Sequence, residues 1–225
     1  MPRESSPRAT KPKSAQGFTR KLLAWFDRHG RDLPWRRTRD PYRVLVSEFM
    51  LQQTQVSRVS EYYPRFLQRF PTVEHLARAK RSAVMEEWDG LGYYARARNL
   101  HSLAKTVAGR GVLPDEPAEL IKLPGIGRYT AGAVASFAYE KSVPAVDTNV
   151  ARVIRRAFVS GNEKRVWAMA GALVPKDGKR AWRFNQAIME LGALICIARK
   201  PKCPECPVRT SCRTGRRLAS KDRRC

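Results

Sequence analysis

The sequence predicts an all-α protein, and three observations support this. Apolar residues recur at helical spacing, prolines and glycines divide the chain into short segments, and no convincing run of alternating residues indicates a strand. The nearest candidate for a strand, residues 142–146, contains Pro144 and runs into a helix-start signal at Asp147. Two apolar helical faces are formed by Phe18, Leu22, Trp25 and Phe26, and by Val56, Val59, Tyr63, Phe66, Leu67 and Phe70.

Breaks between the expected helices follow one another along the chain. They fall at Pro34, Pro41, Pro71, residues 90–92, Pro114, Pro117, Pro124 and Pro144. Between them we expect a short helix at 118–122, a longer one from near Tyr129, one from Asp147 and one at 184–195. This spacing is typical of a compact helical domain, or of two small domains that share a cleft.

The charge of the chain indicates a polyanionic partner. Its 44 Lys and Arg residues stand against 20 Asp and Glu, which gives a net charge of +24. Nucleic acid is therefore the expected partner. No run approaches the roughly 18 to 20 apolar residues of a spanning helix, and no long helix segregates basic residues opposite an apolar face, so we expect no membrane partner.

Both ends of the sequence are basic. Residues 1–16 are rich in Pro and Ser and lack the apolar core and cleavage site of a secretory signal, which predicts a disordered basic arm and a cytoplasmic protein, nucleoid-associated if the cell is prokaryotic. Residues 213–225 predict a basic tail. Salt-sensitive contacts with phosphates and a merely solvated role are both open for these ends.

Four of the five cysteines predict a metal site. Cys196, Cys203, Cys206 and Cys212 follow the pattern C-x6-C-x2-C-x5-C, and no cysteine precedes Cys196, so a disulfide framework is disfavoured. Structural zinc sites generally pair two C-x2-C knuckles, whereas iron-sulfur clusters accept less regular spacing. The spacing favours a cluster over zinc, and Cys225 is expected to be a free thiol. Between and around the ligands stand Arg199, Lys200 and Lys202, which we expect to contact phosphate.

The segment LPGIGRYT at 123–130 predicts a helix-hairpin-helix phosphate clamp. Gly125 and Gly127 permit positive φ and a close approach of backbone N–H groups, with Arg128 and Thr130 at the start of the next helix. A dinucleotide fingerprint would need a preceding strand and a third glycine where Thr130 stands. A purely structural turn between helices stays an alternative.

Two carboxyl groups are placed in contrasting surroundings. Glu48 lies in the apolar stretch 44–51, where desolvation favours the protonated form of an acid. Asp147 stands at a helix start with Asn149, where N–H groups and the helix dipole should favour its ionised form. Such a pair suits hydrolysis of an N-glycosidic bond, which needs an acid and an anion. A solvent-facing Glu and a simple capping Asp are the alternatives.

Seven features together resemble the MutY family of adenine DNA glycosylases, within the helix-hairpin-helix glycosylase superfamily to which endonuclease III belongs. They are LPWR at 33–36, SEFMLQQTQV at 47–56, GLGYYARARNLH at 90–101, LPGIGRYTAGA at 123–133, VDTNVARV at 146–153, FNQAIMELGA at 184–193 and the four cysteines. The resemblance implies two helical lobes with DNA in the cleft between them. Residues 31–140 would form a six-helix barrel with the helix-hairpin-helix, and residues 17–30 plus 141–212 a lobe that carries a 4Fe-4S cluster.

The resemblance also implies roles for individual residues. Glu48 would protonate adenine at N7, Asp147 would stabilise the oxocarbenium-like sugar, and Tyr129 and Asn149 would assist. Gln53 and Tyr93 match residues that wedge into the duplex as the base leaves. The wall of the adenine pocket would be formed by Arg31, Trp35, Leu51 and Gln186.

Tyr129 distinguishes this chain from endonuclease III relatives, which place a lysine at this point of the motif. A Schiff base with the sugar needs that amine. We therefore expect base removal by water, which leaves an abasic site, without efficient strand cleavage. The expected target is adenine opposite 8-oxoguanine or G in double-stranded DNA.

Two alternatives stay open at this stage. Thr148, where many relatives have glycine, is shared in kind with glycosylases that remove thymine or uracil from G·T or G·U mismatches, although the motifs at 47–56 and 90–101 favour adenine. A non-catalytic DNA-binding module with a four-cysteine metal site would show the same charge. Full-length MutY proteins continue into a domain that reads 8-oxoguanine, and this sequence ends shortly after Cys212, so its opposite-base preference is open. We expect a monomer, because a single mismatch has no two-fold symmetry.

Overall fold

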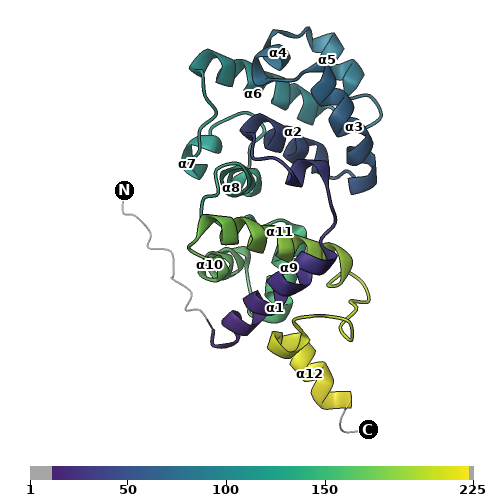
Figure 1. Ribbon diagram of the computed structural model, residues 1–225, viewed down its shortest axis with the longest axis vertical. Helices are drawn as coiled ribbons and strands as arrows, with labels where there is room; N and C mark the ends of the chain where they lie inside the picture. The colour runs from purple at the N-terminus through teal and green to yellow at the C-terminus, as the bar shows by residue number, and fades with distance from the viewer. Residues whose placement is uncertain (1–11, 223–225) are drawn as a thin grey trace. The chain divides into compact units, whose positions relative to one another are not determined.

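The computed structural model describes residues 12–222 and contains only helices in that range, so the all-α prediction is confirmed (Figure 1). The chain divides into two compact units. The internal unit is Asp32–Tyr139, and the terminal unit joins the two ends of the chain, up to Arg31 and from Glu140. The boundaries of the internal unit lie one residue inside the expected lobe of residues 31–140 at each end.

The internal unit is built around one buried helix. Its elements are η1 (Pro34–Arg36), α2 (Pro41–Leu51), α3 (Val56–Arg69), α4 (Val73–Arg78), α5 (Arg81–Glu87), α6 (Ala95–Arg110), α7 (Pro117–Leu120) and α8 (Arg128–Phe137). Helix α2 packs against α3, α6 and α8. It begins where the Asp40 side chain accepts a hydrogen bond from the Arg43 N–H, with Pro41 at the first helical position. Because α2 has neighbours on several sides, most of its residues are buried, polar ones included.

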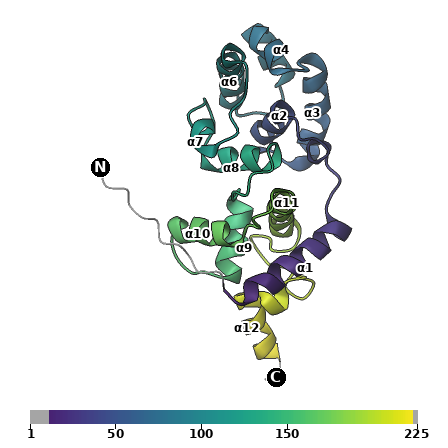
Figure 2. The same cartoon turned by 60° about the vertical axis from the view of Figure 1, so that its left-hand side comes forward.

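The terminal unit is formed by segments far apart in the sequence. Its elements are α1 (Ser14–His29), α9 (Thr148–Ala157), α10 (Glu163–Leu173), α11 (Gly178–Leu194), η2 (Arg209–Ser211) and α12 (Arg213–Asp222). Helix α11 packs against both α1 and α9, and α9 also packs against α10 (Figure 2). Phe18, Leu22, Ile154 and Phe184 lie in their shared core with almost no exposed surface.

Two predictions about the chain ends are wrong where the structure describes them. The expected arm 1–16 overlaps α1, which begins at Ser14 and buries Ala15 completely. Residues 213–222 form α12 instead of a loose tail, because Thr214 Oγ1 donates to the Arg156 carbonyl at 2.8 Å and Arg213 donates to the Arg155 carbonyl at 3.1 Å. Residues 1–11 and 223–225, with Cys225, lie outside the described residues.

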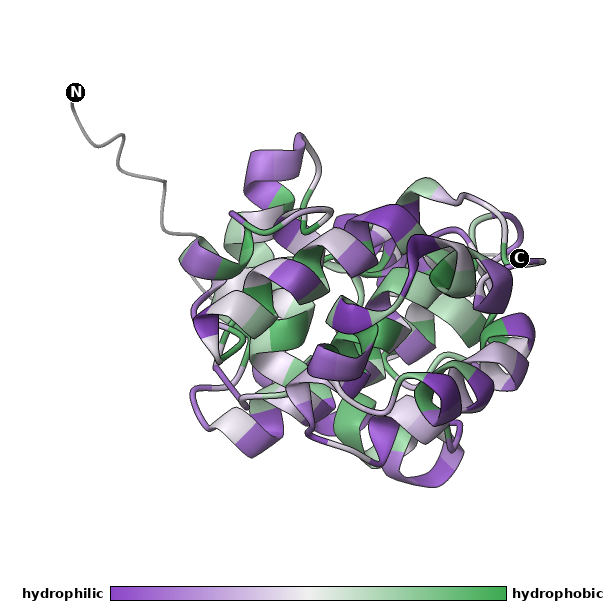
Figure 3. Cartoon of the chain, turned by 90° about the horizontal axis from the view of Figure 1, so that it is seen from above, coloured by the Kyte–Doolittle hydropathy of each residue, from purple (hydrophilic) through white to green (hydrophobic). Residues whose placement is uncertain are grey.

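The helices are amphipathic, as their sequence periodicity predicts. Hydrophilic and hydrophobic residues alternate around the same helices in Figure 3. The expected helix at 118–122 is found as α7 at Pro117–Leu120, and the helix expected at 184–195 starts earlier, after the capping residue Asp177. Within the described residues, no helix combines the length and the apolar character that crossing a membrane requires.

Candidate active site and cysteine loop

Glu48 lies inside the internal unit. It is on α2 and is 3% exposed, so it does not point to solvent. Burial in apolar surroundings penalises the charged form of a carboxyl group and favours the form that can donate a proton. The solvent-facing alternative for Glu48 is therefore wrong, and its side chain is buried as the sequence predicts.

Asp147 caps α9 in the terminal unit, as the sequence predicts. Its Oδ1 accepts a hydrogen bond from the Val150 N–H at 2.7 Å, and its Oδ2 accepts one from Asn149 Nδ2 at 3.0 Å. Burial nevertheless raises the pKa of the Asp147 carboxyl above its ordinary value, although these hydrogen bonds and the nearby Arg152 act to lower it. The expectation that its surroundings favour the ionised form is wrong, because desolvation outweighs the cap.

Asn149 is held in turn by an arginine. Its Oδ1 accepts a hydrogen bond from Arg152 at 2.6 Å, and the same guanidinium donates to the carbonyls of Gly192 at 2.7 Å and Cys196 at 2.8 Å. A Cβ at Gly192 would come within 2.7 Å of the Asn149 Cβ, so α11 can approach α9 this closely only with glycine there. The hydrogen bond from Arg152 and the close approach of α11 at Gly192 therefore both constrain Asn149, which donates to Asp147.

The four residues expected in the base pocket are divided between the units. Trp35 is buried in η1, where its ring meets the Tyr63 ring edge-on at 5.6 Å, and Leu51 ends α2 half-buried. Gln186 is buried on α11. Arg31 donates to Glu190, with Nε 2.7 Å from Oε1 and a terminal nitrogen 3.0 Å from Oε2. The Arg31 guanidinium is thus paired with the Glu190 carboxylate, a partner that the sequence analysis does not predict.

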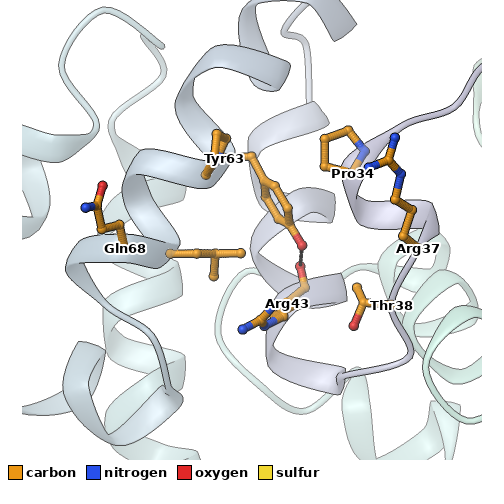
Figure 4. Close-up of a pocket in the computed structure, with 8 residues that line it drawn as sticks. Pro34, Arg37, Thr38, Arg43, Tyr63 and Gln68 are labelled. Carbon is orange, nitrogen blue, oxygen red and sulfur yellow. Dashed lines mark hydrogen bonds between the residues drawn. The ribbon is translucent and has the colours of Figure 1, made fainter.

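A cavity of the internal unit opens beside η1, and Figure 4 shows it. Within it the Tyr63 hydroxyl donates to the Arg43 carbonyl at 3.2 Å. The cavity is lined by Pro34, Arg37, Thr38, Arg43, Tyr63, Pro64, Leu67 and Gln68, so none of the site residues that the sequence predicts lines it.

The two expected wedge residues share an unusual backbone conformation. Gln53 has a φ of 57° and Tyr93 a φ of 48°, both in the left-handed region, and both side chains are exposed. Non-glycine residues in this region carry strain of order 1 kcal/mol. They lie in the loops that follow α2 and precede α6, respectively.

The expected phosphate clamp forms the turn between α7 and α8. Gly125 has a φ of 76°, and a Cβ there would come within 2.7 Å of Asn99 and 2.9 Å of Phe49. Gly127 has an ordinary φ of −91°, so it does not use the positive φ that glycine permits. It caps α8 with open space where a Cβ would stand. Arg128 is exposed, whereas Thr130 is buried.

The four cysteines of the C-terminal cluster gather around one cavity of the terminal unit. Cys196, Cys203, Cys206 and Cys212 all line it, together with Arg156 and Lys202. Arg156 donates to the Cys196 sulfur at 3.4 Å and to the Ile197 carbonyl at 2.7 Å. Burial, followed by the neighbouring thiols, raises the pKa of Cys206 to about 11, so this thiol favours its protonated form. Among the described residues, no three His, Cys, Asp or Glu side chains are positioned to hold a single metal ion.

The cysteine loop carries exposed cations, as the sequence predicts. Arg199, Lys200 and Lys202 are exposed, and Lys200 adopts a φ of 53°. Sequence reasoning missed the arginines that hold the loop, Arg152 and Arg156. Their spacing of four residues on one helix was the available signal, because it places both on the same face of α9.

A profile of the HhH-GPD superfamily of base excision DNA repair proteins matches residues 46–174, more than half of the 225 residues. The chain belongs to this superfamily. The region that matches the HhH-GPD profile includes Glu48, the turn at Gly125 and the α9 cap at Asp147, and it ends before the four cysteines.

Individual members of the superfamily resemble the chain over most of its length. It is 44% identical over 220 residues to an adenine DNA glycosylase of Rattus norvegicus, which covers 89% of this chain and 42% of that protein. It is 47% identical over 194 residues to an adenine DNA glycosylase of Mycolicibacterium smegmatis, a match that covers 83% of this chain and 66% of that protein. The solved structure of a thermostable thymine-DNA glycosylase is 33% identical with a TM-score of 0.84, and covers 91% of this chain and 98% of its own.

The chain therefore spans less than half the length of the rat relative. The motif resemblance to the MutY family is confirmed by the identity with proteins named adenine DNA glycosylase. The two-lobed, all-helical fold that the resemblance implies agrees with the structural match.

The Arg31–Glu190 pair predicts an asymmetric loss of stability. The Glu190 side chain is 1% exposed and that of Arg31 is 35% exposed. Arg31→Met leaves a buried carboxylate without this guanidinium and should lower the free energy of unfolding by about 3 kcal/mol. Glu190→Gln leaves a cation that water reaches, and should lower it by about 1 kcal/mol. Urea unfolding of both variants measures the two losses, and equal losses would contradict the asymmetry.

The raised pKa of Asp147 predicts a pH-dependent stability difference. A group whose pKa is raised by folding loses its contribution to stability as pH rises through that pKa. Asp147→Asn keeps a capping oxygen and removes the charge, so the variant should gain stability relative to the wild type between about pH 4 and pH 7. Asp147→Ala also removes the charge but loses the cap, so it should be about 1 kcal/mol less stable than Asp147→Asn at either pH. Urea titrations at both pH values test this, and a relative loss for Asp147→Asn as pH rises would contradict it.

Proposed function

We propose that the protein is a DNA glycosylase that removes adenine mispaired with 8-oxoguanine or guanine in duplex DNA. The observation that carries the proposal is the buried carboxyl of Glu48 in a chain 44% identical to an adenine DNA glycosylase. Adenine leaves more readily once N7 is protonated, and a buried carboxylic acid can supply that proton. Thymine leaves without such an acid, so Glu48 favours adenine over the target named for the thymine-DNA glycosylase.

The proposed reaction uses the two carboxyl groups in different roles. Glu48 donates its proton to N7 of adenine, the bond between C1′ and N9 breaks, and the electron pair of that bond stays with the departing purine. The Asp147 carboxylate stabilises the positive charge that develops on the sugar. Water then adds to C1′ and releases a proton, which leaves an abasic site. Burial of Asp147 strengthens its attraction for the sugar cation, because the local dielectric is low.

Two further residues assist in this proposal. Asn149 donates to Asp147 Oδ2 at 3.0 Å, which orients the carboxylate and favours its charged form. Tyr129 lies half-buried at the start of α8, where endonuclease III relatives carry a lysine. Because a phenol forms no Schiff base with the sugar, we expect hydrolysis without efficient strand cleavage.

The proposed partner is double-stranded DNA bound by one copy of the protein. The net charge of +24 provides a general attraction for phosphates. The open space beside Gly127 at the start of α8, with exposed Arg128, suits one phosphate. Further phosphates would contact the exposed residues Arg199, Lys200 and Lys202. Gln53 and Tyr93 would enter the base stack, and the flipped adenine would contact Arg31, Trp35, Leu51 and Gln186.

We also propose that Cys196, Cys203, Cys206 and Cys212 bind a 4Fe-4S cluster. Their common cavity supports this, as do two donors to sulfur: Arg156, 3.4 Å from Cys196, and the Gly215 N–H, 3.5 Å from Cys212. N–H donors and nearby cations stabilise the negative charge of thiolate-bound clusters. Once bound, such a group holds the ends of the loop together and keeps its exposed cations in place.

Single-turnover cleavage tests the proposed reaction. Labelled duplexes carrying A opposite 8-oxoguanine, A opposite G and T opposite G are incubated with excess protein and then treated with alkali, at a fixed salt concentration. We expect adenine release from the first two and little nicking before alkali. Glu48→Gln should slow release by about a hundredfold or more, because it cannot donate the proton. Glu86→Gln, an exposed glutamate of the internal unit, should match the wild type.

The outcomes separate three functions. Release of thymine alone would assign the protein to G·T mismatches and remove the role of Glu48. Absence of any base release, with binding retained, would make the chain a non-catalytic DNA-binding module.

Metal analysis tests the proposed cluster. The purified chain should contain about four irons and four sulfides, and Cys203→Ala should lower both contents. Cys225→Ser should leave both contents unchanged. A preparation that contains zinc and no iron would contradict the cluster and favour a zinc site with four cysteine ligands.

A further inference from the structure

One buried arginine of the internal unit joins the two loops that carry the wedge residues. Arg96 lies in the first turn of α6 and is 7% exposed. One terminal nitrogen lies 2.5–3.0 Å from the carbonyl oxygens of Phe49, Met50 and Gln52. The other lies 3.0–3.1 Å from Thr54 Oγ1 and the carbonyl oxygens of Leu91 and Gly92. Each terminal nitrogen carries two hydrogens, which its three acceptors share. One planar guanidinium therefore holds both loops.

The first loop depends on Arg96 because α2 ends there. The last carbonyls of a helix have no helical partner, and a cation near them also interacts favourably with the helix dipole. Arg96 occupies the carbonyls of Phe49 and Met50 in the last turn of α2, and that of Gln52 just beyond it. The hydrogen bonds to the Phe49 and Met50 carbonyls are buried, so water does not replace this donor at those two carbonyls if Arg96 is removed.

The second loop is held at its carbonyls and through its aromatic rings. Arg96 lies over the Tyr93 ring at 5.5 Å and over the Trp88 ring at 5.4 Å. The Trp88 indole N–H also donates to the Gly92 carbonyl at 3.2 Å. Stacking of this kind suits a guanidinium better than an ammonium, because the guanidinium is planar and delocalised.

The strained residues stand next to these anchors. Gln53, with φ 57°, lies between Gln52 and Thr54, both of which bind Arg96. Tyr93, with φ 48°, directly follows Gly92, whose carbonyl accepts a hydrogen bond from Arg96. Left-handed conformations of non-glycine residues persist where the surrounding contacts determine them. The contacts of Arg96 are therefore in position to hold Gln53 and Tyr93 in their left-handed conformations.

We propose that Arg96 is a positioning residue that sets Gln53 and Tyr93 at a fixed separation, so that they enter the base stack together as the target base leaves. The inference rests on the proposed function for the wedge role of these two residues. Arg96 touches neither the base nor the sugar. It acts through the two loops, and its effect is confined to the extrusion step. A lysine keeps the charge but lacks the planar fork, so it cannot bridge both loops.

A comparison of two substrates separates extrusion from general stability. Arg96→Lys should slow single-turnover adenine release from a paired A·8-oxoguanine duplex by about tenfold or more, because unstacking costs a few kcal/mol. Release from a duplex with the adenine in a single-base bulge, already unstacked, should fall by less than about threefold on the same scale. Arg110→Lys makes the same exchange on an exposed residue of α6 and should match the wild type on both. Equal losses of Arg96→Lys on both substrates, or no loss, would overturn the proposal.

A double-mutant cycle tests whether Arg96 acts through Tyr93. In a Tyr93→Ala background the wedge is already shortened, so Arg96→Lys should cause little further loss on the paired duplex. Fully additive losses would overturn the coupling. Thr54→Val provides a milder variant if Arg96→Lys folds poorly, since it removes one acceptor of Arg96 and should cause a smaller loss confined to the paired duplex.

A binding measurement distinguishes failure of this inference from failure of the proposed function. A duplex with 2-aminopurine beside the A·8-oxoguanine pair becomes brighter when a side chain unstacks it, whether or not a base is released. If the wild type brightens this probe but releases no adenine, the proposed function fails, and loss of brightening in Arg96→Lys still supports the positioning role. If the wild type binds the duplex without brightening the probe, Gln53 and Tyr93 are not a wedge and the inference falls.

Discussion

The functional segments of this chain depend on one constraint: backbone groups at helix ends need partners once the helical ladder stops. The two proposed wedge residues lie after α2 and before α6, and the proposed phosphate clamp ends at the cap of α8. Asp147 caps α9, and the cysteine loop begins where α11 ends. A protein built of short helices has many such ends. Arginine side chains satisfy several of them, Arg96 in the internal unit and Arg152 and Arg156 in the terminal unit. The same contacts that stabilise the helix ends therefore shape the loops that would touch DNA.

The electrostatics of the chain work at two length scales. The excess of Lys and Arg is mostly on the surface and attracts any polyanion, without regard to sequence. Folding removes three carboxyl groups from water to different extents. Glu48 is buried on α2, Asp147 is partly buried under a cap, and Glu190 is buried against Arg31. In the proposed reaction, selectivity comes from the local environments of Glu48 and Asp147, because the general charge cannot distinguish one base from another.

Much of the fold and part of the site could be predicted from the sequence, because the interactions involved are local. Helical periodicity, the cap at Asp147 and the turn at Gly125 involve residues a few positions apart, so their signals lie side by side in the chain. The cysteine spacing is local for the same reason. The roles assigned to Gln53, Tyr93 and Gln186 had no such signal and came from the resemblance of whole motifs to a known family. Residues such as Arg96 were missed, since one arginine among 44 Lys and Arg residues carries no mark of burial.

The sequence by itself determined that the chain is helical and basic, that four cysteines stand together, and that a carboxyl group begins the helix at 148. Only the tertiary structure determined which interactions dominate at particular residues. Burial raised the pKa of Asp147 against its own cap, Arg96 reached Phe49 across 47 positions of sequence, and contacts with Arg155 and Arg156 made residues 213–222 a packed helix. The physical reason is that desolvation and long-range hydrogen bonds depend on which segments meet in space, and neither is encoded by the residues adjacent in the chain.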